Sequence, residues 1–242
     1  MTPKEINENA KKYVLQSWSK QKNSNPMPIE KAEGIYFYDY DGNRYTDMTS
    51  QLVNLNLGFG NKEIEQAITK QASQYCYLSP ALGCEARSTL GKLLIEHLPD
   101  SFGKIFFTNA GADANENAVK MARMYTGRNK IFSRYRSYHG SSFGEPRRYA
   151  LEPGVPGFIK FFDPYVYQEK IRFASEEEAT EFYLAKLREQ IIYEGADSVA
   201  AIFLETITGS NGVIIPPKGY LPGVRKICDE FGILMVCDEV MA

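Results

Sequence analysis

The sequence has few of the residues that metal and redox sites use. Its 242 residues include only two histidines, His97 and His139, and four cysteines, none of them in a CxxC spacing. So few histidines exclude a histidine-rich metal site, and a Ser-His-Asp triad would depend on His139 alone. We therefore predict no bound metal and expect the cysteines to be reduced structural thiols.

The chain also lacks a strong net charge and a long apolar run. Its 28 Lys and Arg nearly balance 30 Asp and Glu, and these charges are dispersed along the sequence. Such a balance gives no electrostatic footprint for nucleic acid. No apolar run approaches the roughly 18 residues of a membrane span, and the first residues lack the apolar core of a secretory signal. We expect a soluble, cytoplasmic protein with no nucleic-acid or membrane partner.

The first 54 residues read as an arm followed by a small antiparallel element. A helical pattern over 5–22 runs into Pro26 and Pro28, which must end it. Aromatic and β-branched residues over 34–47 flank Asp41-Gly42, a strong signal for a tight hairpin turn. We predict a domain division at 1–54 and 55–242.

Residues 55–242 alternate between helical patterns and short apolar runs. Helices are predicted over 61–74, 85–98, 115–126, 176–194 and 219–231. Strands are predicted over 104–108, 130–133, 198–204 and 233–237. Continuous apolar strands between helices indicate a parallel sheet covered on both faces, so the predicted fold class is α/β. In such sheets ligands bind beyond the carboxyl ends of the strands. We therefore expect the binding residues in the loops that follow the strands.

The loop after residues 104–108 is rich in small residues and leads into a helix. Gly111 and Ala112 lie where unpaired backbone N–H groups and the helix dipole would favour a phosphate. Ordinary helix capping by Asn109 or Asp113 explains the pattern about equally well. The loop has neither the G-x-G-x-x-G nor the G-x-x-x-x-G-K-[ST] spacing, which disfavours a nicotinamide-dependent dehydrogenase and a P-loop NTPase.

Three further loops carry groups suited to a planar cofactor. Tyr138 can stack on an aromatic ring and His139 can orient it, although an ordinary loop with a surface histidine would look the same. Glu205 and Asp238 each follow a predicted strand. A buried carboxylate facing a heteroaromatic nitrogen keeps that nitrogen protonated. A single such Asp is usually a helix cap, but four such loops at one sheet edge favour a binding site.

Together these motifs resemble the class III aminotransferases, which are pyridoxal-phosphate enzymes of fold type I. The resemblance rests on Gly111-Ala112, Tyr138-His139-Gly140, Glu205 with Gly209 and Gly212, and Asp238-Glu239-Val240, in this order. It implies a three-layer αβα large domain with a mainly parallel sheet, preceded by the amino-terminal segment of a small α+β domain. It also implies pyridoxal 5'-phosphate as cofactor and a homodimer.

The resemblance assigns a role to each matched position. Gly111 and Ala112 would hold the cofactor phosphate, Tyr138 and His139 would lie at one ring face, and Val240 would pack on the other face. Asp238 would pair with the pyridine nitrogen. Glu205 would lie near the ring hydroxyl and the substrate entrance, so that Asp238 and Glu205 are the candidate catalytic residues.

On the substrate side, the resemblance makes Leu52 and Val53 small apolar walls of the pocket. The sequences of residues 50–54 and 134–142 are similar to those of the family branch that includes taurine:2-oxoglutarate aminotransferases. The expected reaction moves an amino group from an ω-amino acid or a taurine-like amino sulfonate to 2-oxoglutarate or pyruvate. Arg147 and Arg148 are candidates for an acidic substrate group, because arginine binds carboxylate and sulfonate oxygens in a forked geometry.

Two departures from the family pattern stand out. The family carries a Schiff-base lysine some tens of residues beyond the segment matched by Asp238, and no lysine in this sequence matches that motif. We therefore expect the sequence to be the amino-terminal part of a transaminase, with the carboxyl-terminal part absent; the alternative is a catalytically dead, truncated remnant. The loop over 141–148 also looks shorter than in relatives.

Overall fold

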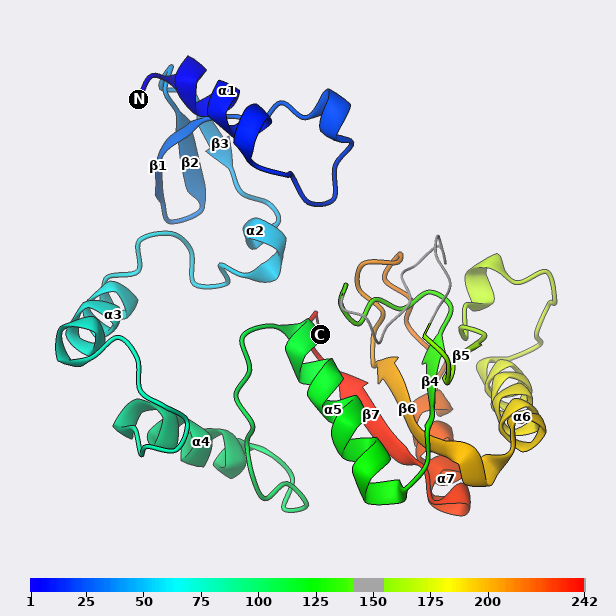
Figure 1. Cartoon of the computed structure of the whole chain (residues 1–242). Coiled ribbons are helices and arrows are strands. Elements are labelled where there is room, and N and C mark those ends of the chain that lie inside the picture. Colours follow the sequence, from blue (N-terminus) through cyan, green and yellow to red (C-terminus); the bar gives the residue numbers. More distant parts are fainter. Residues whose placement is uncertain (142–154, 242) are drawn as a thin grey trace. The chain divides into compact units, whose positions relative to one another are not determined.

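The computed structural model describes residues 1–141 and 155–241, and it divides into two compact units (Figure 1). One unit comprises Met1–Phe102 and the other Gly103–Ala242. The domain division predicted from the sequence, 1–54 and 55–242, stays a prediction.

The first unit begins with an amino-terminal helix and a three-stranded antiparallel sheet. Helix α1 (Pro3–Tyr13) starts at a capping box in which Thr2 and Glu5 bond each other's backbone N–H groups. The sheet has the order β1-β2-β3, with β1 at Ile29–Glu33, β2 at Tyr36–Asp39 and β3 at Arg44–Thr46. The turn at Asp41-Gly42 joins β2 to β3, which confirms the predicted hairpin.

Three helices complete this unit. They are α2 (Ser50–Val53), α3 (Lys62–Gln74) and α4 (Glu85–His97), with a short 3₁₀ turn η1 (Gln21–Asn23) before the sheet. The side-chain oxygen of Asn61 caps α3 by accepting the backbone N–H groups of Glu63 and Ile64. Both longer helices confirm the sequence prediction.

The second unit is built on a parallel four-stranded sheet. Its order is β5-β4-β6-β7, formed by β4 (Lys130–Arg134), β5 (Phe158–Phe161), β6 (Val199–Glu205) and β7 (Leu234–Asp238). The register places Glu205 opposite Asp238 at the carboxyl ends of β6 and β7. All four strands therefore end at one edge, where the predicted binding loops begin.

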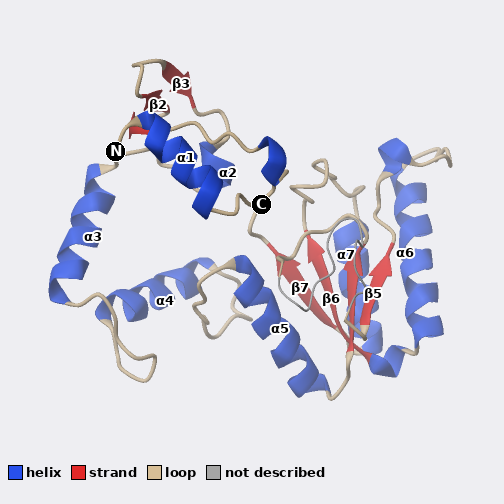
Figure 2. Cartoon of the chain, turned by 45° about the horizontal axis from the view of Figure 1, so that its top comes forward, coloured by secondary structure: helices blue, strands red, loops and turns tan. Residues whose placement is uncertain are grey.

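Helices cover both faces of this sheet (Figure 2). They are α5 (Gly111–Thr126), α6 (Glu176–Glu194) and α7 (Tyr220–Phe231), and the 3₁₀ turns are η2 (Val166–Gln168) and η3 (Ala196–Ser198). One core cluster packs α6 and α7 against one face of the sheet, and a second packs α5 against the other. Strand β6 is buried along its whole length, as its continuous apolar run predicts. The unit is the expected three-layer αβα arrangement.

The structure corrects two sequence predictions. The helix predicted over 5–22 ends at Tyr13, because Val14 is extended and Trp18 has φ +59°, which a right-handed helix cannot contain. The strand predicted over 104–108 is wrong, since neither edge strand of the sheet pairs with it and Phe106 is 63% exposed. An apolar run becomes a strand only when a neighbour satisfies its backbone groups.

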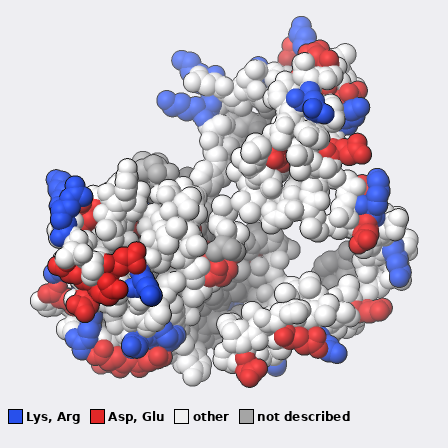
Figure 3. All heavy atoms as spheres, turned by 180° about the vertical axis from the view of Figure 1, so that it is seen from behind, with Lys and Arg blue, Asp and Glu red and all other residues white. Residues whose placement is uncertain are grey.

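Both signs of charge are interspersed on the face drawn in Figure 3, with no extended patch of one sign. Within residues 1–141 and 155–241, no helix has the length and apolar character needed to cross a bilayer.

Candidate functional site

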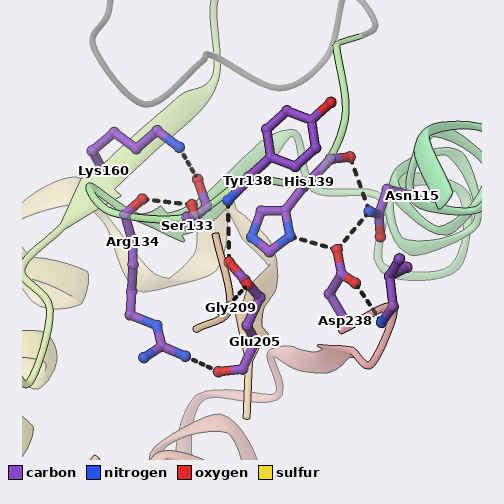
Figure 4. A network of polar contacts seen from close by, with 11 residues as sticks. Asn115, Ser133, Arg134, Tyr138, His139, Lys160, Glu205, Gly209 and Asp238 are labelled. Atoms are coloured by element: carbon purple, nitrogen blue, oxygen red, sulfur yellow. Dashed lines mark hydrogen bonds and ion pairs between the residues drawn. The ribbon is translucent and has the colours of Figure 1, made fainter. Parts of the chain in front are cut away.

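The carboxyl edge of the parallel sheet gathers most of the predicted cofactor residues. Tyr138 and His139 follow β4, Glu205 and Asp238 end β6 and β7, and Gly111 and Ala112 open α5. Hydrogen bonds link these loops to one another, as the close view in Figure 4 shows. The geometry thus brings together residues more than 120 positions apart.

Asp238 is the centre of this cluster. It is 7% exposed, and its Oδ2 accepts hydrogen bonds from His139 Nδ1 at 2.8 Å and from Asn115 Nδ2 at 2.9 Å. Its Oδ1 accepts the backbone N–H of Val240 at 3.1 Å. An ionised carboxylate only accepts, so His139 carries its proton on Nδ1. The two loops and the helix α5 thereby fix the direction of the carboxylate.

These hydrogen bonds also set the charge of Asp238. Burial by itself raises the pKa of this carboxyl group, but the hydrogen bonds from His139, Asn115 and the Val240 N–H outweigh it and hold the pKa below the ordinary value of 3.8. Asp238 is therefore an anion at neutral pH although it is buried. Such an anion can keep a neighbouring cation charged.

Asn115 belongs to this cluster, although the sequence analysis did not single it out. Its Nδ2 donates to the carbonyl oxygen of His139 at 3.0 Å as well as to Asp238. One amide therefore ties α5 to the loop after β4 and to the end of β7. The signal was available: Asn115 lies one helical turn after Gly111 and so faces the same side of the helix.

Glu205 forms hydrogen bonds to the loops that follow β4 and β6. It is 4% exposed, and its two carboxylate oxygens accept the backbone N–H groups of Tyr138 at 3.1 Å and Gly209 at 2.9 Å. The guanidinium of the buried Arg134 also donates to the carbonyl oxygen of Glu205. These bonds hold the segment that carries Tyr138, whose hydroxyl lies 3.0 Å from Ser141 Oγ.

The start of α5 approaches the neighbouring loops closely at two glycines. A Cβ atom on Gly140 would lie 2.6 Å from Ala112 Cβ, and one on Gly111 would lie 2.9 Å from Val240 Cγ2. The residue before the helix, Ala110, provides no side-chain cap. The first backbone N–H groups of α5 thus have no intrahelical partner and are available to an anion.

These observations fit pyridoxal phosphate. A carboxylate offers about four lone-pair directions, and the three hydrogen bonds to Asp238 leave about one free on Oδ1 for a protonated ring nitrogen. The uncapped start of α5 offers N–H groups to a phosphate. The residues present therefore supply both ends of a site for a phosphorylated pyridine.

The remaining predicted residues belong to the first unit or lie outside the described residues. Leu52 and Val53 belong to the first unit, where they are 76% and 42% exposed. Arg147, Arg148 and most of the shortened loop at 141–148 lie outside the described residues. Among those that the structure does describe, no group of three or more His, Cys, Asp or Glu side chains is arranged to hold a metal ion.

A pH prediction follows from the bonds to Asp238. Because folding lowers its pKa, the ionised carboxylate stabilises the fold fully above the ordinary value of 3.8 and loses this effect as the pH falls through the lower, folded pKa. Asn115→Leu removes one donor, so we expect acid unfolding to begin at higher pH, by a few tenths of a unit or more. Circular dichroism against pH measures the onset.

The matched control for this change is Asn117→Leu. Asn117 lies on the same helix, and its side-chain amide donates to the Asp113 carbonyl oxygen. It should leave the onset of acid unfolding where it is in the unmodified protein. An equal shift in both variants would show that Asn115 does not act through Asp238.

Comparison with known proteins identifies relatives along nearly the whole chain. The profile of the family described as Aminotransferase class-III matches residues 18–242. The taurine–pyruvate aminotransferase of Bilophila wadsworthia is 33% identical over 245 aligned residues, which cover 96% of this chain and 53% of that protein. The chain therefore spans about half the length of the curated relatives it matches.

Solved structures agree with this match. The taurine:2-oxoglutarate aminotransferase from Bifidobacterium kashiwanohense, in complex with PLP and glutamate, is 51% identical with a TM-score of 0.93, covering 100% of this chain and 56% of that one. An (S)-enantioselective omega-transaminase from Thermomicrobium roseum is 29% identical, also with a TM-score of 0.93, covering 100% of this chain and 58% of that one.

Proposed function

The chain belongs to the class III aminotransferases, and we propose that the whole protein moves an amino group from an ω-amino acid or a taurine-like amino sulfonate to 2-oxoglutarate or pyruvate. The observation that carries the proposal is the buried, hydrogen-bonded Asp238 beside the uncapped start of α5. The choice of substrates is supported by the similarity to taurine aminotransferases.

Pyridoxal phosphate is the cofactor of this family. When bound, it supplies a protonated pyridine ring that withdraws electrons from the bond to be broken. In the proposed site, the N–H groups of Gly111 and Ala112 would hold the phosphate, and Tyr138 and Val240 would pack against the ring. Each of these residues lies in a loop at the carboxyl edge of the sheet or at the start of α5.

Asp238 keeps the proton on the pyridine nitrogen. An ion pair favours the charged form of both partners, and the hydrogen bonds from His139 and Asn115 ensure that Asp238 contributes the negative charge. Glu205 holds the Tyr138 segment through its bond to the backbone N–H at 3.1 Å. The family resemblance would place it near the ring hydroxyl and the substrate entrance. The family resemblance would make Leu52 and Val53 apolar walls of the substrate pocket.

A donor screen tests the proposed substrates. We expect taurine and β-alanine to be used with 2-oxoglutarate or pyruvate as acceptor. The double variant Arg147→Ala, Arg148→Ala should lower kcat/KM for these acidic donors about 10- to 150-fold, because a hydrogen bond to a charged group contributes about 1.5–3 kcal/mol. A neutral amine donor should be affected much less.

Arg225→Ala is the control, since Arg225 pairs with Asp229 on the surface of α7 at 2.7 Å. Equal effects of both arginine changes on acidic and neutral donors would mean that Arg147 and Arg148 only form surface ion pairs. Activity confined to α-amino acids would refute the proposed substrate class.

A second experiment addresses the alternative of a catalytically dead chain. A polypeptide of residues 1–242 alone is expected to show no turnover above that of free pyridoxal phosphate, because none of its lysines matches the family's lysine motif. Asp238 and the start of α5 would still bind the cofactor weakly. Turnover well above the background, with borohydride trapping the cofactor on a lysine within these residues, would contradict this expectation.

We also propose that the whole protein is a cytoplasmic homodimer. Apart from the family likeness, support comes from the amino-terminal arm, where Tyr13, Val14 and Trp18 are 71%, 55% and 77% exposed. Exposed apolar side chains on a terminal segment are stabilised by packing on a neighbour. Analytical ultracentrifugation that finds a fully active monomer would refute the dimer.

A further inference from the structure

Helix α2 is a left-handed turn made entirely of residues other than glycine. Ser50, Gln51, Leu52 and Val53 have φ values of 48°, 50°, 58° and 65°. For L-amino acids this conformation costs about 1–2 kcal/mol per residue in general, so it occurs normally as single residues. Four in succession require something that holds them.

Two side chains bracket this turn. On its amino-terminal side, Asp47 Oδ1 accepts the backbone N–H of Thr49 at 3.1 Å and of Gln51 at 3.4 Å, while its Oδ2 accepts Gln51 Nε2 at 3.2 Å. On its carboxyl-terminal side, Asn54 Nδ2 donates to the carbonyl oxygens of Gln51 at 2.9 Å and Leu52 at 3.2 Å. Asp47 is itself fixed to the turn between β1 and β2 by its N–H, which donates to Ile35 O at 2.8 Å.

The turn gains little from burial within its own unit. Leu52 is 76% exposed and Val53 is 42% exposed, so neither apolar side chain offsets the backbone strain by packing. Strained segments that persist without such packing are concentrated at functional sites, where they preorganise the groups they carry.

We propose that Asp47 and Asn54 are positioning residues that hold this left-handed turn so that Leu52 and Val53 face the substrate in a fixed arrangement. The inference rests on the proposed transaminase function, which places these two residues in the substrate pocket. It adds that donor selectivity depends on Asp47 and Asn54, which act through the turn and touch no substrate.

The conformation of the turn is tested first, without activity. Ser50 has no side-chain hydrogen bond to preserve, so Ser50→Gly should raise the Tm by about 2 °C, because glycine accepts positive φ freely. Ser50→Val should lower it. The control is Ser73→Gly in the right-handed helix α3, where glycine should lower the Tm. If Ser50→Gly lowers the Tm as Ser73→Gly does, the left-handed turn is refuted, whatever the protein catalyses.

Selectivity is tested next with Asn54→Asp. This change removes both donors at nearly constant shape, so the ratio of kcat/KM for taurine to that for β-alanine should change about tenfold, mainly through KM, with cofactor affinity unchanged. Asn61→Asp makes the same charge change but keeps the α3 cap, and should leave the ratio within about twofold. An unchanged ratio in Asn54→Asp would overturn the positioning role. Absence of transamination in the unmodified protein would instead refute the proposed function.

Discussion

In the whole protein, replacing Asp238 with asparagine is expected to lower kcat about 30- to 5,000-fold while the cofactor still binds. Removing one member of a buried, hydrogen-bonded charge pair costs about 2–5 kcal/mol, and each 1.36 kcal/mol corresponds to a factor of ten in rate. The amide cannot stabilise the protonated pyridine nitrogen, so the ring withdraws electrons less strongly. Steady-state kinetics and a cofactor titration separate the two effects.

The hydrogen bonds around Asp238 make this substitution severe in either orientation of the amide. If its oxygen faces His139 and Asn115, its NH₂ group faces the Val240 N–H and the space for the ring nitrogen. If the amide is turned round, its NH₂ group instead faces two other donors, His139 Nδ1–H and Asn115 Nδ2–H.

The control for this prediction is Asp229→Asn, which makes the same chemical change at the exposed ion pair with Arg225. Asp229→Asn should leave kcat within about twofold, because exposed pairs contribute about 0–1 kcal/mol. If Asp238→Asn behaved in the same way, Asp238 would have another role.

Gly140→Ala is expected to destabilise the second unit by about 2–6 kcal/mol and to weaken cofactor binding. The added Cβ would lie 2.6 Å from Ala112 Cβ and 2.9 Å from Ala112 Cα, and the backbone at Gly140 has φ +119°. Overpacking costs about 1–3 kcal/mol, and an unfavourable backbone conformation adds about 1–3 kcal/mol. Relief of the contact would move the start of α5 away from the position proposed for phosphate binding.

Gly42→Ala separates these two contributions. Gly42 also has positive φ, at +79°, but an added Cβ meets no atom within 4 Å. It should therefore show only the backbone cost and leave cofactor affinity unchanged. Thermal unfolding and a cofactor titration on both variants measure the difference, and equal losses in the two would mean that the contact with Ala112 is unimportant.

The buried strands were the most predictable part of the fold. Strand β6 is a continuous apolar run that is buried on both faces, and such a run is typical of a strand in a covered parallel sheet. Strand β5 was missed because Lys160 interrupts its short apolar pattern. Residues 104–108 show the opposite error, because their pattern suits a strand but no strand within the described residues pairs with them. Pairing is a property of the fold and is not encoded locally.

The site was predictable as a set of loops but not as a network. The rule that ligands bind at the carboxyl ends of parallel strands selected Tyr138, Glu205 and Asp238 one at a time. The bond from Asn115 to Asp238 joins residues 123 positions apart, and the role of Glu205 in holding the Tyr138 backbone depends on the register of the sheet. Local sequence spacing predicts neither contact.

The family assignment came from motif order and is confirmed by the match over residues 18–242. The assigned roles of individual residues remain predictions, and the left-handed turn at residues 50–53 shows why. Its side chains appear in the sequence as a short apolar pair, whereas its conformation depends on Asp47 and Asn54.

The central claim is that Asp238 keeps the pyridine nitrogen of the cofactor protonated. ¹⁵N NMR of the protein loaded with pyridoxal phosphate labelled at the ring nitrogen measures this directly, at a pH above the pKa of that nitrogen in the free cofactor. We expect a protonated nitrogen in the unmodified protein and in Asp229→Asn, and an unprotonated nitrogen in Asp238→Asn. An unprotonated nitrogen in the unmodified protein, or no difference between it and Asp238→Asn, would contradict the account.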